Sequence, residues 1–316
     1  MKICILYGGT SSERDISIST GKSIYDAISD EYEITMCDFD ENYDALLENI
    51  QNVDLVFNAL HGGSGENGAV QKYLESKCVK FTGSNSLASK KAMNKEVSKL
   101  LCVENDIPTP SWFVLSALSS TIDNAFLSRD EMLAKINSFC KIDSENKSIV
   151  VKPNNEGSSV GISILKGITT DCQYSEALDN AFKVSDKILV EEYIGGRELT
   201  VSILDGKVMP IVEIIPKNEY YDYKSKYTKY QSEYVVPAKI SKEVEDLLST
   251  YSLKIHKLIG CGAYSRVDFR LSENNKPYFL ELNTLPGFTD TSLFPKSAAK
   301  EGLEYKNLIK KIIEIS

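Results

Sequence analysis

The first sixty residues alternate between short apolar runs and amphipathic stretches, and this alternation limits the possible fold more than any other feature. The apolar runs at 3–7, 33–37 and 53–58 have the length and composition of buried strands. The stretches at 17–29 and 43–50 between them repeat their apolar residues with a helical period. Strands that alternate with helices predict a parallel α/β unit at the start of the chain.

Glycine-rich loops follow the first and third of these strands. The loop at 8–13 reads Gly-Gly-Thr-Ser-Ser-Glu, and the loop at 61–68 reads His-Gly-Gly-Ser-Gly-Glu-Asn-Gly. Because open parallel sheets bind ligands at the carboxyl ends of their strands, both loops are expected to face one crevice, with His61 directed toward it. The other histidine, His256, lies in an apolar helical stretch and is expected to be structural.

The rest of the chain is predicted to be antiparallel in character. A helical stretch at 85–105 leads to the break Ile107-Pro108-Thr109-Pro110, which predicts a new module. Closely spaced β-rich runs follow at 148–153, 161–165, 187–193, 198–204 and 208–215.

The fold class expected from these patterns is α/β and α+β. A chain of 316 residues exceeds the usual size of one domain, so several modules are expected. We predict a parallel α/β domain at 1–85, a central subdomain at 86–190 and a C-terminal subdomain at 191–316. The second and third would carry antiparallel sheets.

The composition argues against several classes of protein. A content of 42% hydrophobic and 26% charged residues is typical of globular proteins. The net charge of −9 argues against a nonspecific nucleic-acid binder. The seven cysteines form no Cys-x-x-Cys pair, and no apolar run reaches membrane-spanning length, so neither a zinc knuckle nor a membrane partner is expected. These observations together predict a cytoplasmic protein.

A hairpin is predicted at 266–283, where two strand-like runs flank Asn274-Asn275. Asparagine tolerates the positive φ angles that a two-residue turn requires. This turn puts four polar side chains on one face: Asp268 opposite Glu281, and Arg266 opposite Asn283. The other face would be apolar and would consist of Val267, Phe269, Leu280 and Leu282.

The two facing acids predict a metal site. Carboxylates directly opposite each other repel by roughly 0.2–1 kcal/mol at an exposed pair, and a cation removes that repulsion. Oxygen ligands from Asp, Glu and Asn suit Mg²⁺ at substrate phosphates better than zinc. A solvated hairpin remains an alternative, and a three-residue turn would break the facing. The amides and hydroxyls of the following segment, 283–293, favour the metal site.

Several other groups are candidates for binding a nucleotide. Lys152 ends an apolar strand, and the Gly-Ser loop at 156–161 lets backbone amides approach phosphate oxygens. Neither a Walker loop nor a dinucleotide fingerprint occurs. Glu191 and Glu198 could hydrogen-bond adenine or ribose, although ordinary strand-end acids are the alternative. The Tyr- and Lys-rich segment 219–234 is expected to be a mobile substrate lid rather than a nucleic-acid platform.

Taken together, six motifs resemble the D-alanine:D-alanine ligase family of the ATP-grasp superfamily over essentially the whole chain. In the family's order they are Tyr7-Gly-Gly-Thr-Ser-Ser-Glu13-Arg, the loop 61–68, Lys152-Pro with 156–161, Tyr221-Asp-Tyr-Lys-Ser-Lys226-Tyr227, Arg266-Val-Asp268, and Glu281-Leu-Asn283-Thr-Leu-Pro-Gly287-Phe-Thr followed by Ser292-Leu293. Asn67 departs from the family, which often has Asp there. The connection 115–147 is also longer than expected.

The resemblance implies a role for each site residue. The implied metal ligands, for Mg²⁺ or Mn²⁺ as two ions, are Asp268, Glu281 and Asn283. The implied nucleotide ligands are Lys95 and Lys152 at the α- and β-phosphates, Lys226 at the γ-phosphate, Glu191 on the adenine side and Glu198 at the ribose. The implied ligand of the first substrate's ammonium is Glu13, which is linked to Ser158 and Tyr227. The implied ligands of the second substrate's carboxylate are Ser292 and the Leu293 amide. The other implied substrate and catalytic groups are His61, Arg266 and Gly287.

The resemblance also implies an activity. It is the ATP-dependent joining of two D-alanines to D-alanyl-D-alanine through a D-alanyl phosphate, for peptidoglycan precursor and cell-wall synthesis, by an enzyme that forms a homodimer. D-Serine or D-lactate as the second substrate is one alternative, and Tyr227 favours D-alanine over both. A non-catalytic ATP-grasp module that binds nucleotide is another, and the complete set of metal-face residues argues against it.

Overall fold

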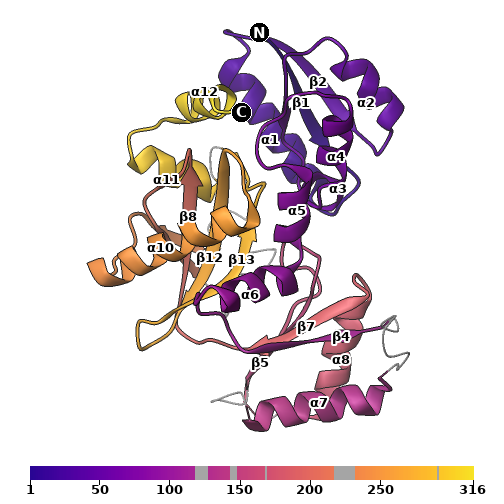
Figure 1. Ribbon diagram of the computed structural model, residues 1–316, viewed down its shortest axis with the longest axis vertical. Helices are drawn as coiled ribbons and strands as arrows, with labels where there is room; N and C mark the ends of the chain where they lie inside the picture. Colours follow the sequence, from indigo (N-terminus) through magenta and orange to yellow (C-terminus); the bar gives the residue numbers. More distant parts are fainter. Residues whose placement is uncertain (118–126, 143–147, 168, 217–231, 290–291) are drawn as a thin grey trace.

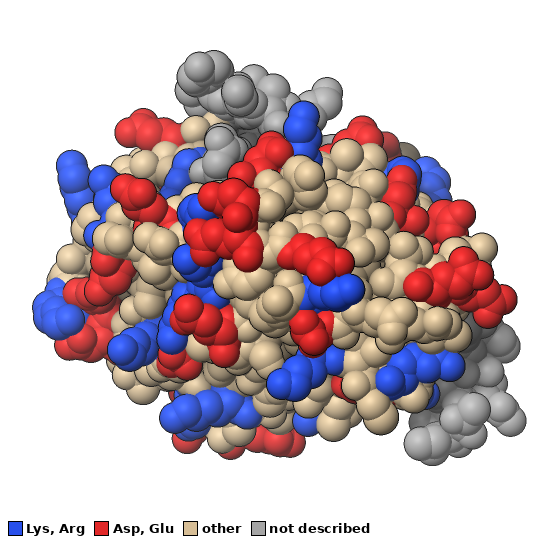
Figure 2. Space-filling model, turned by 90° about the horizontal axis from the view of Figure 1, so that it is seen from above, with Lys and Arg blue, Asp and Glu red and all other residues tan. Residues whose placement is uncertain are grey.

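The structure is a computed structural model that describes residues 1–117, 127–142, 148–167, 169–216, 232–289 and 292–316. These residues form three sheets, one parallel and two antiparallel (Figure 1). On the face seen in Figure 2, acidic and basic side chains are interspersed. In the described part of the chain, no helix is long and apolar enough to cross a membrane.

The first sheet has the parallel order β2-β1-β3 that the alternation predicts. Its elements are β1 (Lys2–Gly8), α1 (Arg14–Ile28), β2 (Glu33–Phe39), α2 (Tyr43–Ile50), β3 (Leu55–Asn58), α3 (Gly63–Glu66) and α4 (Ala69–Ser76). The strands have buried apolar side chains, and Asn42 caps α2 by accepting from two backbone amides. Both glycine-rich loops therefore follow carboxyl ends of neighbouring strands.

The core of this first unit is completed by the end of the chain. The helix α12 (Tyr305–Glu314) lies beside α1, and α11 (Leu293–Lys300) lies between α12 and the last sheet (Figure 1). Leu308 and Ile312 of α12 are fully buried in one cluster with Ile5 of β1 and Ile24 of α1. The hydrophobic face of α12 is therefore covered by residues almost three hundred positions earlier in the chain.

The central sheet is antiparallel, with strand order β4-β7-β5-β6. Its elements are β4 (Trp112–Ser116), α7 (Arg129–Ile142), β5 (Ile149–Pro153), β6 (Ser163–Leu165), α8 (Asp171–Phe182) and β7 (Lys187–Glu192). The two helices bury their apolar side chains against the sheet. A capping box between Thr170 and Gln173 fixes where α8 begins.

The last sheet is also antiparallel and contains the predicted hairpin. Its strands, in the order β11-β10-β8-β12-β13 with β9 beside β8, are β8 (Arg197–Leu204), β9 (Lys207–Val208), β10 (Val212–Pro216), β11 (Ser232–Val235), β12 (Tyr264–Leu271) and β13 (Pro277–Asn283). The covering helices are α5 (Ser86–Met93), α6 (Lys95–Glu104) and α10 (Lys242–Ile259). The predicted helical stretch 85–105 is divided at Asn94, whose side chain caps α6. The domain boundaries at 85 and 190 remain a prediction.

The register of the β12–β13 hairpin is confirmed at its polar face, although the predicted turn is wrong. Asp268 lies opposite Glu281, and Arg266 opposite Asn283, as predicted. The amide of Ser272 bonds the Lys276 carbonyl, and Asn275 has a φ of 58°, so three residues rather than two form the turn.

A β-bulge resolves this difference. The pairing shifts by one residue after Asp268, and Phe269 then lies opposite Phe279. The prediction that Leu280 faces the core is therefore wrong. Phe279 is fully buried, and its ring centroid lies 6.2 Å from that of Phe269, whereas Leu280 is only partly buried. The core accepts the larger aromatic ring, and the bulge preserves the facing of the two acids.

Candidate active site

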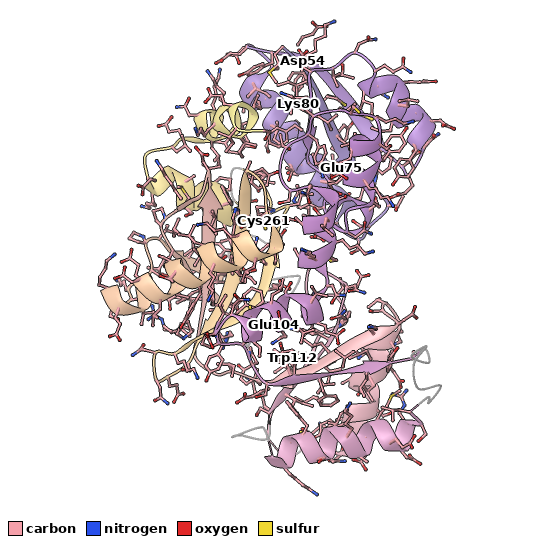
Figure 3. The ribbon with its side chains drawn as sticks, in the orientation of Figure 1. Asp54, Glu75, Lys80, Glu104, Trp112 and Cys261 are labelled. Atoms are coloured by element: carbon pink, nitrogen blue, oxygen red, sulfur yellow. The ribbon has the colours of Figure 1, made fainter. Side chains whose placement is uncertain are left out.

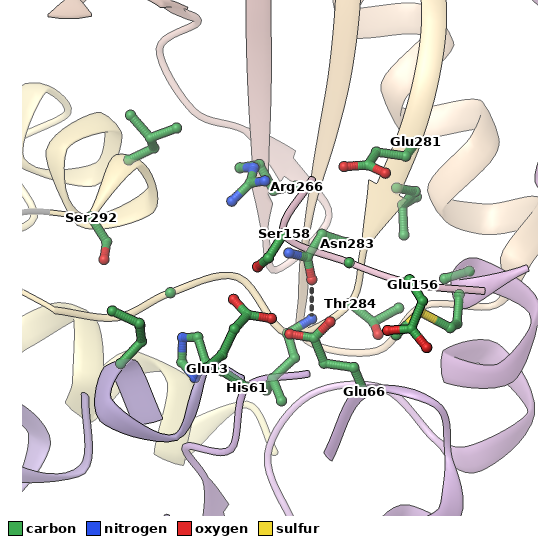
Figure 4. Close-up of a pocket in the computed structure, with 18 of the residues that line it drawn as sticks. Glu13, His61, Glu66, Glu156, Ser158, Arg266, Glu281, Asn283, Thr284 and Ser292 are labelled. Atoms are coloured by element: carbon green, nitrogen blue, oxygen red, sulfur yellow. Dashed lines mark hydrogen bonds between the residues drawn. The ribbon is translucent and has the colours of Figure 1, made fainter. Parts of the chain in front are cut away.

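Two adjoining pockets lie where the three sheets meet. The larger has a volume of about 410 Å³ and is bordered by both glycine-rich loops, the Gly-Ser loop and the segment after β13 (Figure 4). The smaller has a volume of about 130 Å³ and lies between the central and last sheets. Arg266 and Glu281 line both pockets. The polar face of the hairpin is thus the place where the two pockets meet.

Asp268 and Glu281 form the predicted metal face, and cationic side chains accompany both. Arg266 donates to both Asp268 oxygens, at 2.9 and 2.8 Å, and Thr200 donates to Asp268 Oδ1 at 2.5 Å. Lys95 Nζ lies 3.6 Å from Glu281 Oε2. Burial lowers the pKa of Lys95, and Glu281 partly offsets that effect. The two facing carboxylates supply the hard oxygen ligands that a divalent cation prefers, and in this structure Arg266 and Lys95 balance their charge.

Asn283 completes the predicted metal set from the end of β13. Its Oδ1 accepts a hydrogen bond from the Leu285 amide at 2.8 Å (Figure 4). That contact fixes the side chain at the edge of the larger pocket. Among the residues described, no group of three His, Cys, Asp or Glu side chains is arranged to hold a metal ion. A metal here would therefore need the Asn283 amide and substrate oxygens besides the two carboxylates.

Glu13 and His61 lie in the wall of the larger pocket, as predicted. Each side chain is 4% exposed. His61 Nδ1 lies 3.1 Å from the Ala59 carbonyl, and Nε2 has no hydrogen-bond partner in the part of the chain that is described. Burial lowers the pKa of His61, so the ring is neutral, Nδ1 donates to Ala59 and Nε2 is an acceptor. A substrate N–H or O–H group would satisfy that acceptor.

Glu66 is a site residue that the sequence interpretation missed. It lines the larger pocket, and a Cβ atom at Gly157 would lie 3.5 Å from Glu66 Oε2 and 3.9 Å from Glu13 Oε2. Gly157 therefore lies close to two carboxylates. Burial, followed by repulsion from Glu13, raises the pKa of Glu66 to about 8. Its position in the loop 61–68 was the only sequence signal.

The Gly-Ser loop brings Ser158 to the pocket with a strained backbone. Ser158 and Ser159 have φ angles of 52° and 61°, which are uncommon for residues other than glycine. The Ser158 hydroxyl points toward the region between Arg266 and Glu13 (Figure 4). Such strain is typical of binding sites, where the surrounding contacts hold the loop.

Gly287, Ser292 and Leu293 lie together at the far side of the same pocket. Ser292 precedes α11, so the Leu293 amide points out of the helix N-terminus, where anions are stabilised. Thr289 and Ser292 share a hydroxyl contact of 2.6 Å. A Cβ at Gly287 would lie 3.0 Å from Ser292 Oγ and 3.4 Å from His61 Nε2. The absence of a side chain at Gly287 thus keeps this end of the pocket open.

The smaller pocket contains the predicted adenine and ribose residues. Lys152 and Glu191 form a buried ion pair, and Glu198 lies 3.3 Å from Arg270 Nη1. Burial alone would raise the pKa of Glu191, but the adjacent lysines bring it below its usual value. Apolar side chains form one part of the wall: Val150, Ile162, Ile164, Ile194, Ile214 and Leu280. Polar and charged residues, among them Arg266, Asp268 and Glu281, form the other part. Apolar walls beside charged groups suit an aromatic base that is joined to a polar sugar and phosphates.

The predicted lid and His256 have different outcomes, and one residue beside Asp268 was not predicted. Lys226 and Tyr227, with most of the predicted lid at 219–234, lie outside the described residues. His256 is buried beside Ser265 Oγ, at 2.8 Å from its Nδ1, as expected for a structural histidine. Thr200 was missed because only the pairing of β8 with β12 brings it opposite Asp268.

Comparisons with known proteins agree with this geometry. A family model described as the D-ala D-ala ligase C-terminus matches residues 104–314. A D-alanine--D-alanine ligase of Aquifex aeolicus is 39% identical, over 99% of this chain and 100% of that relative. One of Halalkalibacterium halodurans is 38% identical, over 100% and 99%. The structure of D-alanine--D-alanine ligase from Bacillus anthracis complexed with ATP superposes with a TM-score of 0.82 at 35% identity, covering 100% of this chain and 96% of that one.

Proposed function

Because this chain belongs to the D-alanine–D-alanine ligase family, we propose that its adjoining pockets join two D-alanine molecules at the expense of ATP. The observation that carries this proposal is the position of Arg266 and Glu281 in the walls of both pockets. A reaction between a carboxylate and the terminal phosphate of a nucleotide needs the two substrates to meet at one charged boundary. The polar face of the hairpin provides such a boundary.

The larger pocket has the groups that two amino acids require. The Glu13 carboxylate suits the ammonium of the first D-alanine, and the neutral His61 can accept a hydrogen bond from it. The α11 N-terminus, through the Leu293 amide and Ser292, suits the carboxylate of the second D-alanine. The carboxylate of the first D-alanine would then point away from Glu13, toward Arg266.

The chemistry has two steps in this arrangement. A carboxylate oxygen of the first D-alanine attacks the γ-phosphorus, and ADP leaves, which forms D-alanyl phosphate. The amine of the second D-alanine then attacks the acyl carbon, and inorganic phosphate leaves. Arg266 and the Gly287 amide face the region where negative charge develops. Ser158, with Tyr227 of the lid, is assigned to the first substrate.

The nucleotide would occupy the smaller pocket. Glu191 is assigned to the adenine side, Glu198 to the ribose, and Lys152 and Lys95 to the phosphates. Lys226, outside the described residues, is assigned to the γ-phosphate. A divalent metal held by Asp268, Glu281 and Asn283 would neutralise phosphate oxygens at the boundary between the pockets.

The proposal includes a biological setting. D-alanyl-D-alanine is a component of peptidoglycan precursors, so the enzyme would act in cell-wall synthesis in the cytoplasm, as a homodimer. D-Serine and D-lactate remain the alternative second substrates, since Tyr227, which favours D-alanine, is not described.

Product analysis tests the proposal. Purified protein with Mg-ATP is incubated with D-alanine alone and with D-alanine mixed with D-serine or D-lactate, and the products are identified by mass spectrometry. We expect D-alanine-dependent phosphate release with D-alanyl-D-alanine as the main product of every mixture. A dominant mixed product would refute the choice of second substrate, and the absence of D-alanine-dependent phosphate release would refute the ligase itself.

A further inference from the structure

Lys99 is a buried lysine to which neither the motifs nor the proposed reaction assigns a role. It lies on α6 one helical turn after Lys95, and none of its side chain is exposed. Its Nζ donates to Thr109 Oγ1 at 2.7 Å and to the Pro110 carbonyl at 3.2 Å, and it lies 2.8 Å from Glu191 Oε2. A buried ammonium persists only where it is paired and hydrogen-bonded, and these contacts satisfy that requirement.

Glu191 is shared between Lys99 and Lys152. Lys152 lies against Oε1 and Lys99 against Oε2, and Glu191 as a residue is 2% exposed. The two lysines differ in access, because Lys152 lines the smaller pocket and Lys99 does not. Lys152 is therefore the lysine that can turn toward a phosphate, while Lys99 remains behind the carboxylate.

The position of Lys99 is fixed from several elements. Thr109 Oγ1, which accepts from Lys99, donates to the Phe279 carbonyl of β13 at 2.9 Å, and the Phe279 amide donates to the Pro108 carbonyl at 2.8 Å. The Trp112 ring, at the start of β4, lies with its centroid 5.2 Å from Lys99 Nζ (Figure 3). These contacts join α6, the central sheet and the hairpin, so Lys99 cannot follow a movement of Lys152.

A movement of Lys152 toward phosphate would leave Glu191 with one less cation. An uncompensated carboxylate at a buried site is strongly unfavourable. With Lys99 in place, Glu191 keeps one counter-ion when Lys152 leaves. Without Lys99, Lys152 would be the one cation left to the carboxylate among the residues that the structure describes, and the carboxylate would compete with the phosphate for it.

We propose that Lys99 is a positioning residue for nucleotide binding, which holds Glu191 and balances its charge so that Lys152 is free to bind phosphate. This inference rests on the proposed function, since it takes the smaller pocket to be the nucleotide site. It adds a residue that does not touch the nucleotide and that acts through Glu191. Loss of Lys99 should therefore affect the contact between Lys152 and the phosphates more than the binding of the base.

The test compares the binding of ADP with that of adenosine, which has the base and ribose but no phosphate. Full-length wild type, Lys99→Met, Glu191→Gln and the double variant are titrated with each ligand by calorimetry or by competition. We expect Lys99→Met to lower the affinity for ADP by about tenfold or more and the affinity for adenosine by less than about threefold. We expect Glu191→Gln, added to Lys99→Met, to recover about fivefold or more of the ADP affinity, because it releases Lys152.

Lys187→Met is the matched control, because Lys187 is an exposed lysine of β7, the strand that carries Glu191, and its Nζ lies 3.6 Å from Glu96 Oε2. It should leave both affinities unchanged within about twofold. The proposal would be overturned if Lys99→Met lowered the affinities for ADP and adenosine equally. It would also be overturned if the double variant bound ADP more weakly than Lys99→Met does.

The test remains decisive if Lys99→Met does not fold. The double variant, which lacks the Glu191 carboxylate, should then bind ADP as Glu191→Gln does, within about twofold. A clearly weaker double variant would refute a role through Glu191. The two proposals can fail separately, since the ligase is judged by the product of the wild-type enzyme and the role of Lys99 by this pattern of affinities.

Discussion

Replacing Glu66 by glutamine should change how the stability of the protein depends on pH. The pKa of Glu66 is raised from 4.5 to about 8 by burial and by Glu13, so the folded protein holds this proton at pH values where the unfolded chain has lost it. The free energy of unfolding therefore includes a contribution that is fully present below pH 4.5 and is lost as the pH rises through about 8. Glutamine resembles the protonated acid and does not titrate.

The size of the effect follows from the pKa difference and from the position of Glu66. A displacement of about 3.5 units would correspond to at most about 5 kcal/mol, at 1.36 kcal/mol per unit. Glu66 is partly exposed and lines an open pocket, so solvent relieves much of the penalty, and we expect about 1–2 kcal/mol. For a protein of this size, that energy amounts to a difference in Tm of about 2–4 °C.

Thermal unfolding of both proteins between pH 5.5 and 9 measures this difference. We expect Glu66→Gln and wild type to have similar Tm values at the acidic end, and the variant to gain about 2–4 °C by the alkaline end. Glu48→Gln, which changes an exposed glutamate of α2, controls for the loss of a carboxylate and should run parallel to wild type. Parallel curves for Glu66→Gln as well would refute the raised pKa.

Two substitutions test the remaining parts of the site. Asp268→Asn should lower kcat by about 10²–10³-fold, because the variant keeps the size of the side chain and loses the charge that would hold a cation. Its Tm should also fall, since the amide cannot accept both hydrogen bonds from Arg266. Steady-state kinetics that match wild type would contradict the metal face. Gly287→Ala should raise the KM for D-alanine by about 10–100-fold, because the new methyl group would lie 3.0 Å from Ser292 Oγ. An unchanged KM would show that D-alanine does not bind beside Gly287 and Ser292.

Patterns in the sequence predicted the parallel unit and the antiparallel strands well, because their spacing repeats locally. The hairpin shows where such reasoning ends. Asn274 and Asn275 favoured a two-residue turn, but Asn275 alone adopts the left-handed conformation, in a three-residue turn. The choice between these turns depends on whether Phe279 or Leu280 enters the core, and that depends on Phe269 and the helices beyond it. No local pattern contains this information.

The candidate site was predictable where a motif carried the chemistry and was missed where only the fold did. Glu13, His61, Arg266 and Ser292 meet in one pocket, as their motifs indicated. The contacts of Lys99 depend on burial and on partners from three elements, which a lysine in an amphipathic helix does not reveal. Glu66 was missed for a similar reason, since only the fold brings it into the pocket wall near Glu13, whereas an acid in a glycine-rich loop usually faces bulk water.

The return of α12 to the first sheet has a consequence for how the protein is made. Synthesis proceeds from the amino terminus, and domains commonly fold as they emerge from the ribosome. Here Ile5 and Ile24 are covered by Leu308 and Ile312, which are translated about three hundred residues later. The parallel unit can therefore close its core only after α12 has been synthesised, and a nascent chain would expose that apolar surface until then.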